Sequence, residues 1–170
     1  MATMPATGEL DARFSDAHAE ATPWPHVQLV LDEAETFWLA TVRPDGRPHV
    51  TTLIAVWQDE AAWFCTGPDE RKARNLAVNP WCTLTTGRNE LGTGLDVVLE
   101  GRARQVDDPV RLRTVADAYV AKYGHDWAFA VEDGAFAHAD GGRALVFALA
   151  PTTIFGFRKG EVFSQTRWRP

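Results

Sequence analysis

The sequence predicts a mainly β domain, built as a closed antiparallel barrel with a few flanking helices. Short segments rich in β-branched and aromatic residues follow one another, separated by turns that contain Gly or Pro. Two or three helical segments lie between them without the regular strand-helix alternation of a doubly wound sheet. The chain has 170 residues, 45% of them hydrophobic, which is enough for one domain with one substantial core.

Composition excludes several classes of function. The formal charge of -6 opposes binding to nucleic acid, and no local basic face offsets it. No stretch approaches the roughly 20 apolar residues of a membrane span, and the N-terminus lacks a basic region followed by an apolar run. We therefore expect a cytoplasmic protein with neither membrane nor nucleic-acid partners. Cys65 and Cys82 lie in apolar stretches, and no spacing of His, Cys, Asp and Glu predicts a metal site.

The N-terminal part divides into an arm and a capping helix. Residues 1–24 have little periodic hydrophobicity and are interpreted as a mobile arm or a loosely attached short helix, which leaves 25–170 as the folded domain. Apolar residues at helical spacing predict an amphipathic helix over 25–35, with Pro25 suited to its first turn.

Eight strands are expected on the basis of their residue types and bounding turns. They are 37–42, 48–57, 61–65, 81–86, 95–106, 144–150, 152–157 and 162–168. Pro151 separates the sixth from the seventh. The strand 48–57 is apolar on both faces, so its outer side needs a cover, and a second subunit is the most economical one.

Two further helices are expected between the strands. Asp69 is a plausible N-cap for one that runs to Val78, before Asn79 and Pro80 stop it. Asp108 and Pro109 begin the other, which carries one apolar stripe and ends at Gly124. The following segment, 125–142, mixes Gly, Asp and His with aromatic residues and is interpreted as a long functional or interface loop.

The most specific local signal runs from Thr66 to Lys72. A strand ends in the hydroxyl of Thr66, a loop follows, and the next helix carries Arg71 and Lys72 in its first turn. Cations are unfavourable at a helix N-terminus, whereas a dianionic phosphate would gather the free backbone N–H groups, the hydroxyl and both cations. A solvated helix face in which Glu70 is a local ion-pair partner is the simpler interpretation, and the residues alone favour it.

The run FWLATVRPDGRPHVTTLIAVWQDEAAWFCTGPDERKARNLAVNPW, residues 37–81, resembles the pyridoxamine 5'-phosphate oxidase-like family. These are split β-barrel flavoproteins, and they include the related deazaflavin-dependent reductases. The resemblance covers 37–106 well and the C-terminal strands more weakly, with hairpin, phosphate loop and helix in the family order. It implies an antiparallel split β-barrel that works as a homodimer, with the cofactor near the subunit interface.

The resemblance also implies which residues bind the cofactor. The family holds flavin phosphate with an Arg-Lys pair and a strand-terminal Thr, which match Arg71, Lys72 and Thr66, and the adjacent Cys65 is counted with them. The isoalloxazine ring would lie along the second strand. The residues of that strand are Val50, Thr51, Thr52 and Leu53.

The resemblance leaves two candidate cofactors, FMN and F420, and one loop residue, Glu70, departs from the pattern of the oxidases proper. FMN is the expected cofactor and coenzyme F420 the alternative, since both carry a phosphate on a ribityl chain; Arg43, Arg47 and Arg74 are candidate linings for the longer deazaflavin tail. Glu70 stands where the oxidases proper have Ser, and we expect its carboxylate to point away from the phosphate.

The C-terminus departs from the oxidases proper, which use an Arg and a His there to hold pyridoxal substrate. No His follows His138, so oxidation of vitamin B6 is not expected. Trp168 would stack near the ring or close the barrel core, with neither role preferred. Arg167 and Arg169 are candidates for a phosphate or an acidic substrate. His49 is a candidate donor to flavin or substrate, although an exposed histidine near a turn is the commoner outcome.

The leading hypothesis is an FMN- or F420-dependent oxidoreductase that acts on a small, planar substrate and is not a true pyridoxamine phosphate oxidase. No catalytic residue is assigned, because the cofactor carries the hydride chemistry; water, Tyr123 or His125 would exchange the proton. The alternative is a non-catalytic protein that binds or carries flavin, deazaflavin or haem.

Overall fold

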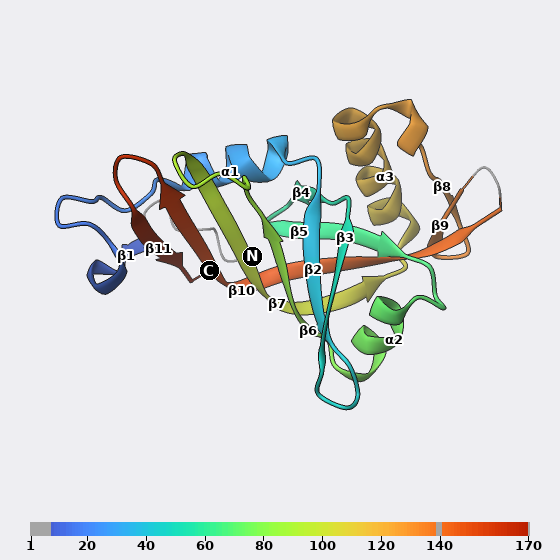
Figure 1. The fold of residues 1–170 in the computed structure, drawn as a ribbon. Helices are drawn as coiled ribbons and strands as arrows, with labels where there is room; N and C mark the ends of the chain where they lie inside the picture. The colour runs from blue at the N-terminus through green and yellow to red at the C-terminus, as the bar shows by residue number, and fades with distance from the viewer. Residues whose placement is uncertain (1–7, 139–140, 170) are drawn as a thin grey trace.

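The fold is one antiparallel sheet that curls into a split barrel, with three α-helices around it (Figure 1). The computed structural model describes residues 8–138 and 141–169. The strands are β1 (Glu9–Leu10), β2 (Phe37–Val42), β3 (Pro48–Leu53), β4 (Val56–Gln58), β5 (Ala61–Thr66), β6 (Trp81–Thr86), β7 (Gly94–Val106), β8 (Ala130–Glu132), β9 (Ala135–Ala137), β10 (Arg143–Lys159) and β11 (Ser164–Trp168). The helices are α1 (Trp24–Glu33), α2 (Arg71–Val78) and α3 (Pro109–Tyr123), with short 3-10 turns at Ala12–Phe14 and His125–Trp127. The predicted mainly β class is confirmed.

Strand β10 organises the barrel. The sheet order is β1-β11-β10-β7-β6-β2-β3, and β5 also pairs with β10. One edge of β10 pairs with β7, while the other edge pairs first with β5, where Leu145 faces Thr66, and then with β11, where Phe155 faces Arg167. The prediction of two strands separated by Pro151 is wrong. Pro151 sits at a shift of register with β7, where the ladder needs no N–H donor from it, so the strand continues.

Two other predicted segments are divided differently. The strand expected over 48–57 breaks at Ile54 and Ala55 into β3, which pairs with β2, and β4, which pairs with β5. The segment 125–142, interpreted as a loop, contains a 3-10 turn and the hairpin β8–β9, whose second strand pairs with the start of β10.

The helix boundaries mostly agree with the sequence signals. Asp108 caps α3 by accepting a hydrogen bond from the backbone N–H of Arg111, as predicted. Gly124 ends that helix at φ +86°, a conformation that favours glycine. Helix α2, in contrast, has Glu70 at its N-cap position rather than Asp69, and no side chain caps it.

The N-terminal segment is attached where the structure describes it. Residues 1–7 lie outside the described residues, but Glu9 and Leu10 pair with β11 and the backbone N–H of Thr22 donates to Thr166 Oγ1 at 2.9 Å. The expected loose arm is therefore wrong for residues 8–23. Within 8–138 and 141–169, no helix is long and apolar enough to cross a membrane.

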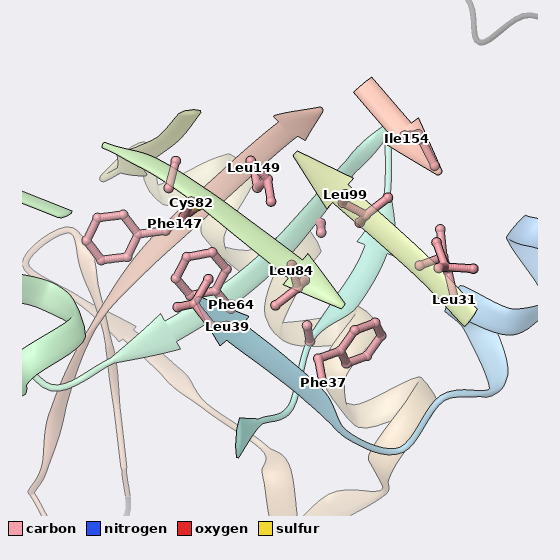
Figure 2. Packing of buried hydrophobic residues seen from close by; sticks show 14 of the residues in the cluster. Leu31, Phe37, Leu39, Phe64, Cys82, Leu84, Leu99, Phe147, Leu149 and Ile154 are labelled. Carbon is pink, nitrogen blue, oxygen red and sulfur yellow. The ribbon is translucent and has the colours of Figure 1, made fainter. Parts of the chain in front are cut away.

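Two hydrophobic clusters hold the sheet and its helices together. The larger fills the barrel under α1, and Figure 2 shows Leu39, Leu84 and Leu99 directed into it beside Phe64 and Phe147, whose rings stack at 5.6 Å. The second lies under α3 and includes β8–β9 residues. In Figure 1 the end of β5 lies beside α2 and the start of β10, whereas β11 lies at the opposite end of the sheet.

Candidate phosphate site and adjoining pocket

A buried polar contact fixes helix α2 against the sheet. Asn75 is completely buried, and its Nδ2 donates to Thr41 Oγ1 on β2 at 2.9 Å. Lys72 and Leu76, which are also buried, share this inner side of the helix. The first turn of α2 therefore stands at a fixed place next to the end of β5, which is what a phosphate loop requires.

The loop from Thr66 to Lys72 closes around the carboxylate of Glu70. The backbone N–H of Gly67 donates to Glu70 Oε1 at 2.8 Å, and Lys72 Nζ donates to Glu70 Oε2. The buried Thr66 hydroxyl donates to the Gly67 carbonyl at 3.4 Å, and the Thr66 side chain helps to lower the pKa of Glu70. The expectation that Glu70 points away is wrong. These donors converge on one place, and the carboxylate of Glu70 is the nearest anion that can satisfy them.

Charges around the loop are mainly positive. Partial burial raises the pKa of Glu70, but hydrogen bonds from Lys72, Gly67 and Thr66 outweigh it and lower that pKa overall. The pKa of His49 is lowered by burial and by the charges of Arg43, Arg71 and Lys72. Lys72 contributes to both shifts, because a positive charge favours the ionised carboxylate and disfavours the protonated imidazole.

Two of these cations have unused hydrogen-bonding capacity. The buried Nε of Arg43 has no partner, and the guanidinium of Arg71 forms neither an ion pair nor a hydrogen bond with any part of the chain that the structure describes. Both charges act on His49.

A pocket of about 320 Å³ adjoins the loop and unites several of the predicted residues. Its lining includes Thr52, Leu53, Cys65, Thr66 and Glu70 from the predicted region, together with Trp127, Phe129 and His138. The ring of Phe129 meets the ring of His138 edge-on at 4.9 Å. Trp127 and Phe129 were not singled out in the sequence, although the aromatic content of 125–142 was a signal for them, and His138 was noted only as part of that segment.

Other predicted residues do not line this pocket. Val50 is 58% exposed on the outer face of the sheet, and Thr51 and His49 lie outside the lining. Lys72 does not line the pocket but donates to Glu70, which does. Arg71 is exposed.

The pocket chemistry is largely neutral. Burial raises the pKa of the Cys65 thiol to about 11, so this residue is an uncharged part of the wall. Tyr123 is a poor proton donor, because burial raises its pKa to about 12 and its hydroxyl bonds the Ala55 carbonyl at 2.8 Å. His125, the other expected proton partner, does not line the pocket, and the histidine found there is His138.

The three C-terminal candidates lie at the other end of the protomer. Thr66 and Arg167 face positions ten residues apart on β10, which corresponds to about 30 Å. Trp168 is 1% exposed and packs edge-on against Trp24 at 5.9 Å, so its predicted stacking on a cofactor is wrong and its core role is confirmed. Arg167 pairs with Glu9 at 2.6 Å, and Arg169 lies 3.6 Å from the same carboxylate.

Another cavity, of about 720 Å³, lies between α1 and the turn that joins β6 to β7. Its charged lining mixes acids such as Glu33 and Glu35 with bases such as Arg88 and Arg158, and it contains none of the predicted site residues. Within the described residues, no group of three or more His, Cys, Asp or Glu side chains could hold a metal ion.

The sequence family is decided by a match over most of the chain. The family model for pyridoxamine 5'-phosphate oxidase matches residues 24–157. This chain belongs to that family. The matched region contains the loop, α2 and the pocket strands β3 and β5, and it stops short of β11.

One curated member of this family and two solved structures illustrate what the chain is similar to in sequence and in fold. It is 35% identical over 109 residues to a pyridoxine/pyridoxamine 5'-phosphate oxidase of Pseudomonas putida, covering 62% of this chain and 47% of that one. The chain thus matches about half the length of this curated relative. Its fold is similar to a haem-binding protein from Mycobacterium smegmatis, with TM-score 0.64 and 16% identity over 83% of this chain and 56% of that one. It is also similar to an F420 reductase, with TM-score 0.52 and 24% identity over 75% and 94% of the two chains.

Proposed function

We propose that this protein is an oxidoreductase that uses FMN or coenzyme F420, holding the cofactor phosphate at Thr66 to Lys72. The observation that carries the proposal is the convergence of donors at this loop. The Gly67 N–H and Lys72 donate to one carboxylate, Thr66 lines the same pocket as that carboxylate, and the charges of Arg43, Arg71 and Lys72 all act on His49. A lysine on an ordinary solvated helix face is mostly exposed, whereas Lys72 is only 8% exposed.

The adjoining pocket suits the planar ring of either cofactor. Strand β3 ends the sheet order beside β2, so among the described strands its other edge keeps free N–H and C=O groups that can pair with ring heteroatoms. Leu53 and Cys65 provide uncharged walls, and Phe129 and Trp127 provide aromatic surface opposite. At about 320 Å³ the pocket is at the small end of ligand sites, so a tricyclic ring would extend beyond it.

When bound, the cofactor supplies hydride transfer. The residues of the chain orient it, exclude water with aromatic side chains, and position His138 to exchange a proton with substrate. Aromatic walls favour a small, planar substrate. Pyridoxamine phosphate is not the substrate that we propose, because Arg167 and Arg169 pair with Glu9 at the other end of the sheet.

We also propose a homodimer that completes this site. Cross-strand neighbours Trp38, Thr52, Thr85, Val98 and Phe155 form a row across the outer face of the sheet. Trp38 is 40% exposed, and Val50 and Trp81 leave still larger fractions exposed. A second copy on this face would cover these side chains and adjoin the pocket, because Thr52 belongs to both.

The direct test is the absorbance spectrum of the protein as purified and after addition of FMN or F420, followed by stopped-flow oxidation of the reduced complex. We expect one cofactor to bind with a shifted spectrum and to pass electrons to small planar acceptors. A protein that binds neither cofactor contradicts the proposal. A protein that binds one but leaves every acceptor unreduced is instead a carrier, the alternative consistent with its likeness in fold to a haem-binding protein.

A further inference from the structure

The carboxylate of Glu70 occupies the position in which the loop would receive an anion. It accepts a hydrogen bond from the Gly67 N–H through one oxygen and from Lys72 through the other, and the nearby Thr66 side chain helps to lower its pKa. Gly67 and Lys72 are two of the loop donors on which the proposed phosphate site depends. The Glu70 carboxylate therefore accepts hydrogen bonds from the loop donors and is not simply a solvated side chain on the helix surface.

We infer that Glu70 is an internal anion that competes with the cofactor phosphate and so limits the affinity of this chain for phosphate-bearing ligands. The inference rests on the proposed function, because it concerns the same loop. A carboxylate and a phosphate repel each other at hydrogen-bonding distance, so both cannot share these donors at neutral pH. Binding of phosphate must then displace the Glu70 side chain or place the two anions next to each other.

The surroundings of Glu70 allow this displacement. The Glu70 side chain is 52% exposed, whereas the Lys72 side chain is 10% exposed. The acid can therefore rotate outward while the lysine stays in place. The charges of Arg43 and Arg71 lie near enough to lower the pKa of His49, and among the described residues neither guanidinium forms an ion pair with Glu70. The loop consequently retains attraction for a second, more highly charged anion.

Asp69 provides a matched control for the removal of one negative charge. It precedes Glu70 directly, its side chain is 97% exposed, and its recorded ion pair is a 3.8 Å contact with Arg74. Neutralising Asp69 changes the net charge by the same amount without vacating the loop. The substitution D69N thus reports the effect of general charge, and E70Q reports the effect of the carboxylate within the loop.

The experiment measures binding of FMN, F420, riboflavin and inorganic phosphate to wild type, E70Q, E70A and D69N. Flavins are followed by fluorescence quenching, and phosphate by the rise in melting temperature. We expect E70Q and E70A to bind FMN about tenfold more tightly or better, a gain comparable with one lost charge contact. Riboflavin, which has no phosphate, should bind all four proteins equally, and D69N should behave as wild type.

Phosphate distinguishes this inference from the function on which it rests. If E70Q gains stabilisation by phosphate but no variant binds FMN or F420, competition by Glu70 is supported and the flavin function is contradicted. If wild type and both Glu70 variants bind FMN with equal affinity, or the variants bind it less tightly, the function is supported and competition by Glu70 is overturned. An equal gain for riboflavin would also overturn it, because the effect would not involve phosphate.

Discussion

Replacing Lys72 with Met should weaken binding of FMN far more than it weakens the fold. Lys72 is 8% exposed, and its amino group already donates to the carboxylate of Glu70. Loss of one charged hydrogen bond to a dianionic phosphate costs about 1.5–3 kcal/mol, which raises the Kd of FMN roughly 10- to 150-fold. Competition from Glu70 for the same amine places the expected result in the lower part of that range.

The assay is a fluorescence titration with FMN and with riboflavin, compared between K72M and R74Q. Arg74 lies on the same helix but is 57% exposed and pairs weakly with Asp69, so its variant controls for helix charge. The unfolding free energy of K72M should fall by no more than about 1 kcal/mol, because its partner Glu70 is half exposed. Equal affinity of K72M and wild type for FMN, with both proteins folded, would refute the assignment of Lys72 to phosphate.

Three further predictions concern the interface, the core and a buried cation. Trp38→Glu should convert a dimer to a monomer in analytical ultracentrifugation, whereas Val110→Glu, at an exposed site on α3, should not. A Trp38→Glu protein that remains a dimer would reject the outer sheet face as the interface. Leu149→Ala should lower the unfolding free energy by about 2–5 kcal/mol in urea titrations, because Leu149 is completely buried, and a loss below about 1 kcal/mol would contradict that packing. Burial lowers the pKa of Lys122 to about 8 from its ordinary 10.5, so the unfolded chain holds more protons between these values and this residue should make stability rise with pH there. Lys122→Met should lose that rise, and equal slopes in the two proteins would contradict it.

Local patterns predicted most of the fold. The strands 37–42 and 81–86 were found at their expected bounds because hydrophobic alternation and turn residues bracket them closely. Asp108 and Gly124 delimit α3 for reasons contained within a few residues. The predicted break at Pro151 was wrong because the continuity of β10 depends on its pairing with β7, which is distant in sequence.

The candidate site was predicted only in part, for the same physical reason. Thr66 and Lys72 follow from the order of strand, loop and helix, and the structure brings both to Glu70. The direction of the Glu70 side chain depends on which donors converge in space, and sequence spacing does not show this. His138 reaches the pocket through the β8–β9 hairpin, a pairing that a loop interpretation of 125–142 conceals.

The central claim is that this loop binds a cofactor through its phosphate. The most direct measurement is the ratio of the Kd for riboflavin to the Kd for FMN, obtained by titrating the ligand-free wild-type protein under identical conditions. Because the two ligands differ only in the phosphate, a ratio of about 10 or more is the expected result. A ratio near 1, with both ligands bound, would contradict the claim.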